Sequence, residues 1–111
     1  IVGRRTLETD NMGMGLPAAD LQEQRLREGR TAEPLRVVFS GSGRLGPGLK
    51  LFRTPGAPIV VFTSAAMPAS VRRRLDRIAD VRLLRGNGAV GLRAALAVLA
   101  ADYKVRVAVC E

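Results

Sequence analysis

The sequence contains no histidine, no tryptophan and a single cysteine, Cys110. One cysteine cannot form a disulfide within the chain, and without histidine a metal cluster is not expected. The missing histidine also excludes the Ser-His and Cys-His pairs that activate a nucleophile. Cys110 ends an apolar run, which favours a buried and unreactive thiol.

Long apolar runs are also absent from the sequence. No run approaches the roughly 20 residues that a helix needs to cross a bilayer, and no basic-then-apolar leader opens the chain. We therefore expect a soluble, cytoplasmic protein with no membrane partner. The 111 residues suffice for one domain at most, and a hydrophobic content of 47% is enough to bury a core.

The formal net charge is +8 and is carried almost entirely by arginine. A basic balance is typical of nucleic-acid binders, but the aromatic residues that stack on bases make up only 4% of the chain. The arginines are scattered apart from the run Arg72-Arg73-Arg74. We therefore expect no nucleic-acid partner. A basic α/β module that binds a nucleotide or nucleic acid, without redox activity, is the alternative.

The first ten residues predict a short strand that breaks at Gly3 into a helix. The first N–H groups of a helix have no partner within it, so a phosphate can accept their hydrogen bonds. Arg4 and Arg5 add forked donors and Thr6 adds a hydroxyl, which suits a terminal phosphate. On these ten residues alone, an ordinary glycine turn with two solvated arginines is the commoner interpretation.

The rest of the chain alternates between predicted strands and helices. Apolar, β-branched runs predict strands at residues 35–39, 59–63 and 81–84, and a buried strand at 105–110. Helical spacing predicts a surface helix over residues 17–29, a helix over 68–79, and a helix with one apolar stripe from Leu92 to Tyr103. This alternation predicts a three-layer α/β/α domain with a mainly parallel sheet.

Polar turns follow several of the predicted strands, where ligands of parallel sheets bind. Besides the Gly3 turn, these are Ser40–Arg44, Thr63–Ser64, the glycine turn at residues 86–88, and Glu111. A hairpin-like Gly/Ser loop is the alternative for Ser40–Arg44. The gathering of these turns at one edge favours a ligand site more strongly than any one of them.

The run Gly3-Arg4-Arg5-Thr6, followed by Asp10-Asn11, resembles the turn G-x-x-T-x-x-x-D-[DN]-P of the dihydrofolate-reductase-like superfamily. The closer resemblance is to the reductase domain of the riboflavin-biosynthesis deaminase/reductase. The chain departs from that pattern at Met12, where proline is usual, and at Glu8, where arginine is frequent. Val109-Cys110-Glu111 matches the beginning of the family's Val-Glu-Gly-Gly run. We expect residues 1–111 to be the interior part of a single reductase domain, without its first strand and its C-terminal strands.

The resemblance implies a dihydrofolate-reductase-like fold that binds NADPH. It also implies hydride transfer to the ribose-derived carbon of a phosphoribosylamino-pyrimidine, which opens the sugar to a ribityl chain. A related pterin or pyrimidine compound is the alternative substrate. No residue is identified as a catalytic acid or base, no metal is expected, and we expect a homodimer. By position, the resemblance assigns cofactor binding to Gly3, Arg4, Arg5, Thr6, Ser40, Ser42, Arg44, Thr63 and Glu111, and substrate binding to Asp10 and Asn11.

Overall fold

A computed structural model describes residues 1–11, 13–14, 19–46, 48–64, 67–84 and 91–109. Within these ranges no helix is long and apolar enough to cross a membrane. The elements follow in the order β1 (Val2–Gly3), α1 (Arg4–Asp10), α2 (Ala19–Arg27), β2 (Arg36–Phe39), α3 (Lys50–Arg53), β3 (Ile59–Thr63), α4 (Ala69–Leu75), β4 (Asp80–Leu83) and α5 (Leu92–Asp102).

The four strands form one parallel sheet in the order β1-β2-β3-β4. All five residues of β3 are buried, as expected for an inner strand covered on both faces. Its neighbour β2 has three buried residues and one half-buried residue. The strands predicted at residues 35–39, 59–63 and 81–84 are confirmed, and so is the mainly parallel sheet.

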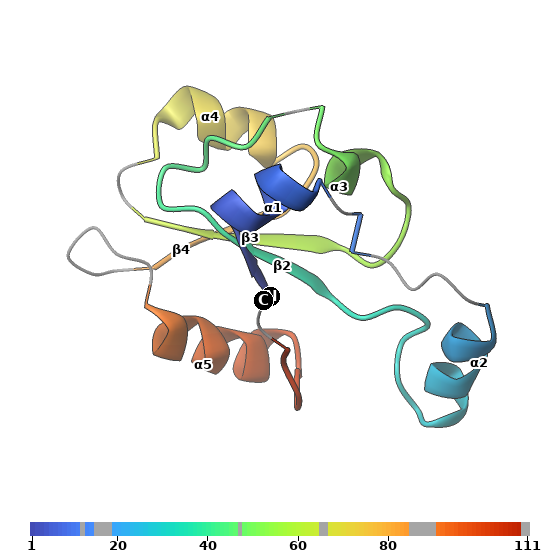
Figure 1. The fold of residues 1–111 in the computed structure, drawn as a ribbon. Coiled ribbons are helices and arrows are strands. Elements are labelled where there is room, and N and C mark those ends of the chain that lie inside the picture. Colours follow the sequence, from blue (N-terminus) through green and yellow to red (C-terminus); the bar gives the residue numbers. More distant parts are fainter. Residues whose placement is uncertain (12, 15–18, 47, 65–66, 85–90, 110–111) are drawn as a thin grey trace.

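Helices cover both faces of the sheet, with α1, α3 and α4 on one face and α5 on the other (Figure 1). On the first face, Leu7, Leu51 and Leu75 each bring one helix into the core beside the strands. On the second face, Ala95 and Leu99 anchor α5. The predicted three-layer α/β/α fold is therefore confirmed.

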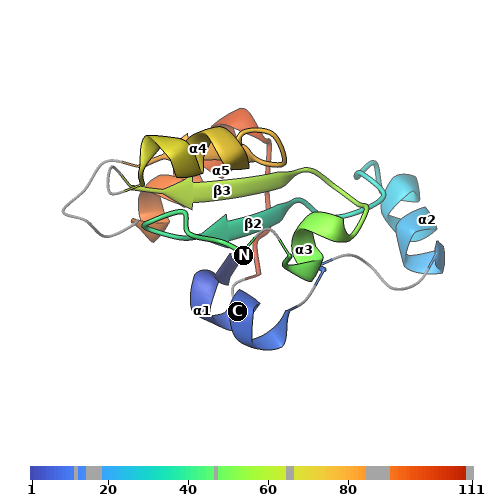
Figure 2. The same cartoon turned by 90° about the horizontal axis from the view of Figure 1, so that it is seen from above.

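Helix α2 projects from the body of the domain in both views (Figures 1 and 2). None of its residues is buried, and Leu26 is 58% exposed. Side chains of this helix bond the segment before β2: Gln22 Nε2 donates to Glu33 Oε1 at 3.0 Å, and Arg25 Nε donates to the Thr31 carbonyl oxygen at 2.9 Å. The predicted surface helix is confirmed.

The buried strand predicted at residues 105–110 is wrong for the part that the structure describes. Residues 105–109 form no strand, and Val107 and Val109 are 76% and 70% exposed. The N–H group of Val105 instead donates to the Leu99 carbonyl oxygen at 3.1 Å, which continues the end of α5. A β-branched sequence forms a strand only where a neighbouring strand offers backbone partners. Cys110 lies outside the described residues.

Two helices differ from the sequence-based expectation. The helix predicted over residues 68–79 ends earlier, at Leu75, and Ile78 beyond it is 43% exposed. The one-turn helix α3 has no counterpart in the sequence analysis, because a single turn is too short to show helical periodicity. Its buried residue, Leu51, nevertheless contributes to the core.

A polar cluster fastens the end of α5 to β4. The Tyr103 hydroxyl donates to the Asp80 carboxylate, and the Arg82 guanidinium donates to the Asp102 carboxylate. Arg82 Cζ also lies 5.7 Å from the centroid of the Tyr103 ring. Burial, together with the hydrogen bond to Asp80, raises the pKa of Tyr103. The fold therefore favours the neutral phenol.

We expect this cluster to make the protein sensitive to alkaline pH. A group whose pKa is raised by folding contributes stability that is fully present below its unfolded pKa, about 10 for tyrosine. That stability is lost as the pH rises through the folded pKa. Tyr103→Phe should therefore flatten the alkaline decline in melting temperature. Tyr103 is the only tyrosine in the chain, so phenolate absorbance reports its titration directly. Parallel pH profiles of the two proteins would contradict the expectation.

Candidate functional site

The register of the sheet brings the polar turns after the first three strands to one edge. Gly3 lies beside Phe39, and Phe39 lies beside Phe62. All three residues stand at or next to the carboxyl end of their strand, so the turns that follow open in the same direction. The predicted shared edge is confirmed for these turns. The glycine turn at residues 86–88 and Glu111 lie outside the described residues.

The turn after β1 is open at its glycine and carries two exposed arginines. A Cβ atom on Gly3 would have no neighbour within 4 Å, so a ligand can approach the backbone there. Arg4 Nη1 lies 3.9 Å from Glu8 Oε1, an exposed pair of the kind that contributes little energy. The Arg5 guanidinium has no hydrogen bond or ion pair with another described residue, and Thr6 is half-buried. Arg5 is therefore the more available cation of the two.

The turn after β2 is shaped by its own serines. The Ser40 hydroxyl accepts a hydrogen bond from the Gly43 N–H at 3.1 Å, and the Ser42 hydroxyl accepts one from the Arg44 N–H at 3.3 Å. Arg44 is exposed, and its guanidinium has no partner within the described ranges. Because β2 and β3 run parallel, the hairpin alternative for this turn is wrong. Arg44 is the cation that this turn directs to solvent.

A single carbonyl group joins the second turn to the third. The Gly41 oxygen accepts hydrogen bonds from Thr63 Oγ1 at 3.1 Å, from Ser64 Oγ at 2.8 Å and from the Ser64 N–H at 3.3 Å. The Thr63 side chain is fully buried. We therefore assign Thr63 to holding the turn in place, and its direct contact with a cofactor stays a prediction.

Replacing Gly43 should loosen this turn measurably. Gly43 has φ +68°, and a Cβ added there would lie 2.4 Å from Met67 Sδ. We expect Gly43→Ala to cost about 1–3 kcal/mol of unfolding free energy, from left-handed strain and steric overlap together. Adding Met67→Ala should relieve the overlap and leave the strain. Urea denaturation of both variants separates the two parts, and an unchanged midpoint for Gly43→Ala would contradict the assignment.

The two residues predicted to bind substrate lie at the far end of α1. Asp10 is its last residue, and Asn11 follows in the left-handed conformation with φ 46° and ψ 53°. Over seven helical residues the rise is about 10 Å, so the structure separates this end of α1 from the Gly3 turn. The Asn11 Oδ1 atom accepts a hydrogen bond from the Lys50 N–H at 2.8 Å. A contact of either residue with substrate stays a prediction.

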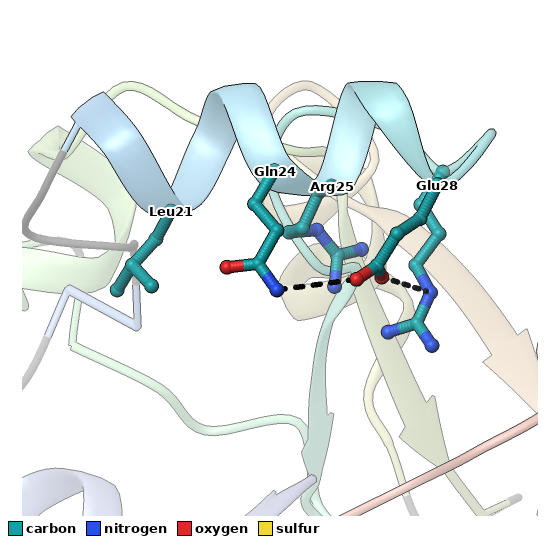
Figure 3. Close-up of a pocket in the computed structure, with 5 residues that line it drawn as sticks. Leu21, Gln24, Arg25 and Glu28 are labelled. Carbon is teal, nitrogen blue, oxygen red and sulfur yellow. Dashed lines mark hydrogen bonds and ion pairs between the residues drawn. The ribbon is translucent and has the colours of Figure 1, made fainter.

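Two of the hollows on the described surface lie away from these turns. One, of about 360 Å³, lies along α2 and is lined by Leu21, Gln24, Arg25, Glu28 and Arg30. Figure 3 shows Gln24 directed toward Glu28, and Gln24 Nε2 donates to Glu28 Oε1 at 3.2 Å. Arg30 Nε lies 3.5 Å from Glu28 Oε2. The other, of about 1830 Å³, lies between the segment after α2 and residues 103–109. Neither hollow is lined by a described residue that was predicted to bind the cofactor.

Sequence analysis did not identify the central role of Arg36, the first residue of β2. Its side chain is buried, and burial lowers the pKa of Arg36, while the charge of Glu33 raises it. The only sequence signal is an arginine at the start of an inner strand, where a charge needs partners. The guanidinium donates to the carbonyl oxygens of Gly13 at 3.1 Å, Leu51 at 3.2 Å, Thr54 at 2.8 Å and Ala57 at 2.9 Å.

Comparison with known proteins agrees with this architecture. The model of the RibD C-terminal domain family matches residues 1–109. No curated protein matches the chain. A pyrimidine reductase-like protein from Corynebacterium diphtheriae has a similar structure, with a TM-score of 0.68 and 24% sequence identity. The match covers 92% of this chain and 44% of that protein, so the chain spans less than half of the length of its structural relative. At this identity the likeness supports the fold, and the family match over nearly the whole length shows that the chain belongs to the RibD C-terminal domain family.

Proposed function

We propose that the protein is an NADPH-dependent reductase of riboflavin biosynthesis that acts on a phosphoribosylamino-pyrimidine. Family membership supports a reductase of this pathway. The observation that favours a phosphorylated cofactor is a pair of guanidinium groups, Arg5 and Arg44, in neighbouring turns at the carboxyl edge of the sheet. Neither group has a hydrogen-bond or ion-pair partner among the described residues. The open backbone at Gly3 lies in the same turn as Arg5.

Each turn has a distinct task in this proposal. Bound NADPH supplies the hydride, and the protein binds and orients it. Arg4 and Arg5 hold the phosphate that distinguishes NADPH from NADH, because a guanidinium offers paired donors to phosphate oxygens. Arg44 adds positive charge from the neighbouring turn. Thr63, with the serine hydroxyls of the second turn, holds the turn that carries Arg44 in place. A related pterin or pyrimidine compound is the alternative substrate.

Thermal shift and oligonucleotide binding test this proposal against the basic binding module. NADPH at 100 times its dissociation constant should add about 2.7 kcal/mol and raise the melting temperature by several degrees. Duplex and single-stranded oligonucleotides should bind only weakly at physiological salt, because the arginines of α4 are solvated or locally paired. Submicromolar oligonucleotide binding, together with no thermal shift from NADPH, would rule out the reductase interpretation in favour of the basic binding module.

A further inference from the structure

We infer that Asn11 is a positioning residue, which docks the end of α1 on α3 and so determines where α1 presents Arg4 and Arg5. The inference rests on the proposed function, since it concerns the same pair of arginines. It gives Asn11 a role in cofactor binding, although Asn11 follows the last residue of α1 and the two arginines are the first residues of that helix.

Helix α1 has few other anchors. It is seven residues long, and Leu7 is its only buried residue. Its first turn has no side-chain cap, because the N-cap residue is Gly3. The start of α1 is held by β1, which pairs with β2, but beyond Gly3 a two-turn helix with one buried side chain can still tilt or rotate about that contact. A second attachment point is therefore needed to fix the direction of its exposed side chains.

Asn11 supplies this second attachment. Its Oδ1 atom accepts the Lys50 N–H at 2.8 Å, and Lys50 is the first residue of α3. The N-cap residue of α3 is Leu49, which has no side-chain oxygen to cap the helix. Asn11 therefore provides, from 39 positions away in the sequence, an acceptor that α3 lacks locally. The left-handed conformation of Asn11 is one that asparagine adopts more readily than most residues.

The partner helix is itself firmly held. Leu51 of α3 is fully buried, and the carbonyl groups of Leu51 and Thr54 accept hydrogen bonds from Arg36. Arg36 also binds the carbonyl oxygen of Gly13, two residues after Asn11. Gly13 lies so close to Thr54 that an added Cβ would be 2.5 Å from Thr54 Oγ1. The segment after α1 is thus fastened to α3 at two points, and α3 is fastened to the core.

Three variants of the protein separate positioning from general stability. Asn11→Gly removes the amide and tolerates the left-handed backbone. Asn11→Asp keeps an oxygen acceptor, and its added charge is largely screened at about 10 Å in physiological salt. Thr9→Ala alters an exposed residue of the same helix and is the matched control. The readouts are the dissociation constants for NADPH and NADH, together with hydrogen exchange at the Lys50 amide.

We expect Asn11→Gly to weaken NADPH binding about five- to tenfold, which corresponds to one hydrogen bond of ordinary strength, and to change NADH binding much less. The Lys50 amide should exchange faster in this variant. Asn11→Asp should restore both readouts to within about twofold of the unaltered protein, and Thr9→Ala should leave them unchanged. NADPH binding that Asn11→Gly leaves intact would overturn this inference alone. Absence of NADPH binding by the unaltered protein would overturn the proposed function as well.

Discussion

Replacing Arg4 and Arg5 together with alanine should weaken NADPH binding about 10- to 100-fold, whereas NADH binding should change less than about threefold. The two cofactors differ by one phosphate, and a charged hydrogen bond to it contributes roughly 1.5 to 3 kcal/mol. Both arginines are exposed at the start of α1, and only Arg4 has an ion-pair partner among the described residues. Titration calorimetry with each cofactor measures the difference.

Loss of net charge alone could also weaken the binding of an anionic cofactor. The double variant Arg73→Ala, Arg77→Ala is the matched control, because it removes the same charge from an exposed region on and just after α4. We expect this control to affect NADPH and NADH alike and only slightly. Equal losses for the two cofactors in the Arg4 and Arg5 variant would remove the argument that these side chains recognise the extra phosphate.

The largest loss of stability is expected for Arg36→Ala, at about 3–5 kcal/mol and a fall in melting temperature of more than about 10 °C. The substitution leaves four carbonyl groups without their donor. It also removes the nearby positive charge from Glu33, whose Oε2 atom is buried and has no hydrogen-bond partner in the described structure. Chemical denaturation followed by circular dichroism measures the loss.

Two further substitutions make this expectation specific. Arg36→Lys keeps the charge, but an ammonium group cannot reach carbonyls in the fork geometry of a guanidinium, so we expect an intermediate loss. Arg53→Ala removes an exposed arginine from α3 and should change the unfolding free energy by less than about 0.5 kcal/mol. A loss below about 1 kcal/mol for Arg36→Ala would show that the buried guanidinium does not organise this region.

The parts of the fold that the sequence predicted correctly are those with a local signal. The inner strands are short runs of β-branched and apolar residues, and the turns after them are marked by glycine and serine. Because parallel strands share the direction of their carboxyl ends, the strand assignments alone placed Gly3, Ser40 and Thr63 at one edge. The resemblance then favoured the phosphate-binding interpretation of Arg4 and Arg5 over an ordinary glycine turn.

The features that sequence analysis missed depend on distant partners. Arg36 acts through carbonyl groups at residues 13, 51, 54 and 57, and Asn11 acts through the backbone of Lys50. A backbone carbonyl or N–H is present at every such position, so no residue type signals the pairing. The strand expected at residues 105–109 did not form for the converse reason. Its β-branched composition is a local signal for a strand, but a strand also needs a neighbouring strand to pair with, which the local sequence does not supply.

The placement of α5 on the opposite face has a consequence for the order of folding. Strands β1 to β4 lie side by side in the order of the sequence, so each strand pairs with the one before it and closes a chain loop of moderate length. Right-handed crossovers that advance along a sheet share one face, whereas a helix on the other face carries the chain back across it. Val105 therefore makes its contact with the apolar cluster that also holds Ile1 only after the intervening strands and α5 are in place. Because loop closure costs more entropy as the loop lengthens, this contact should form last in folding and open first in unfolding.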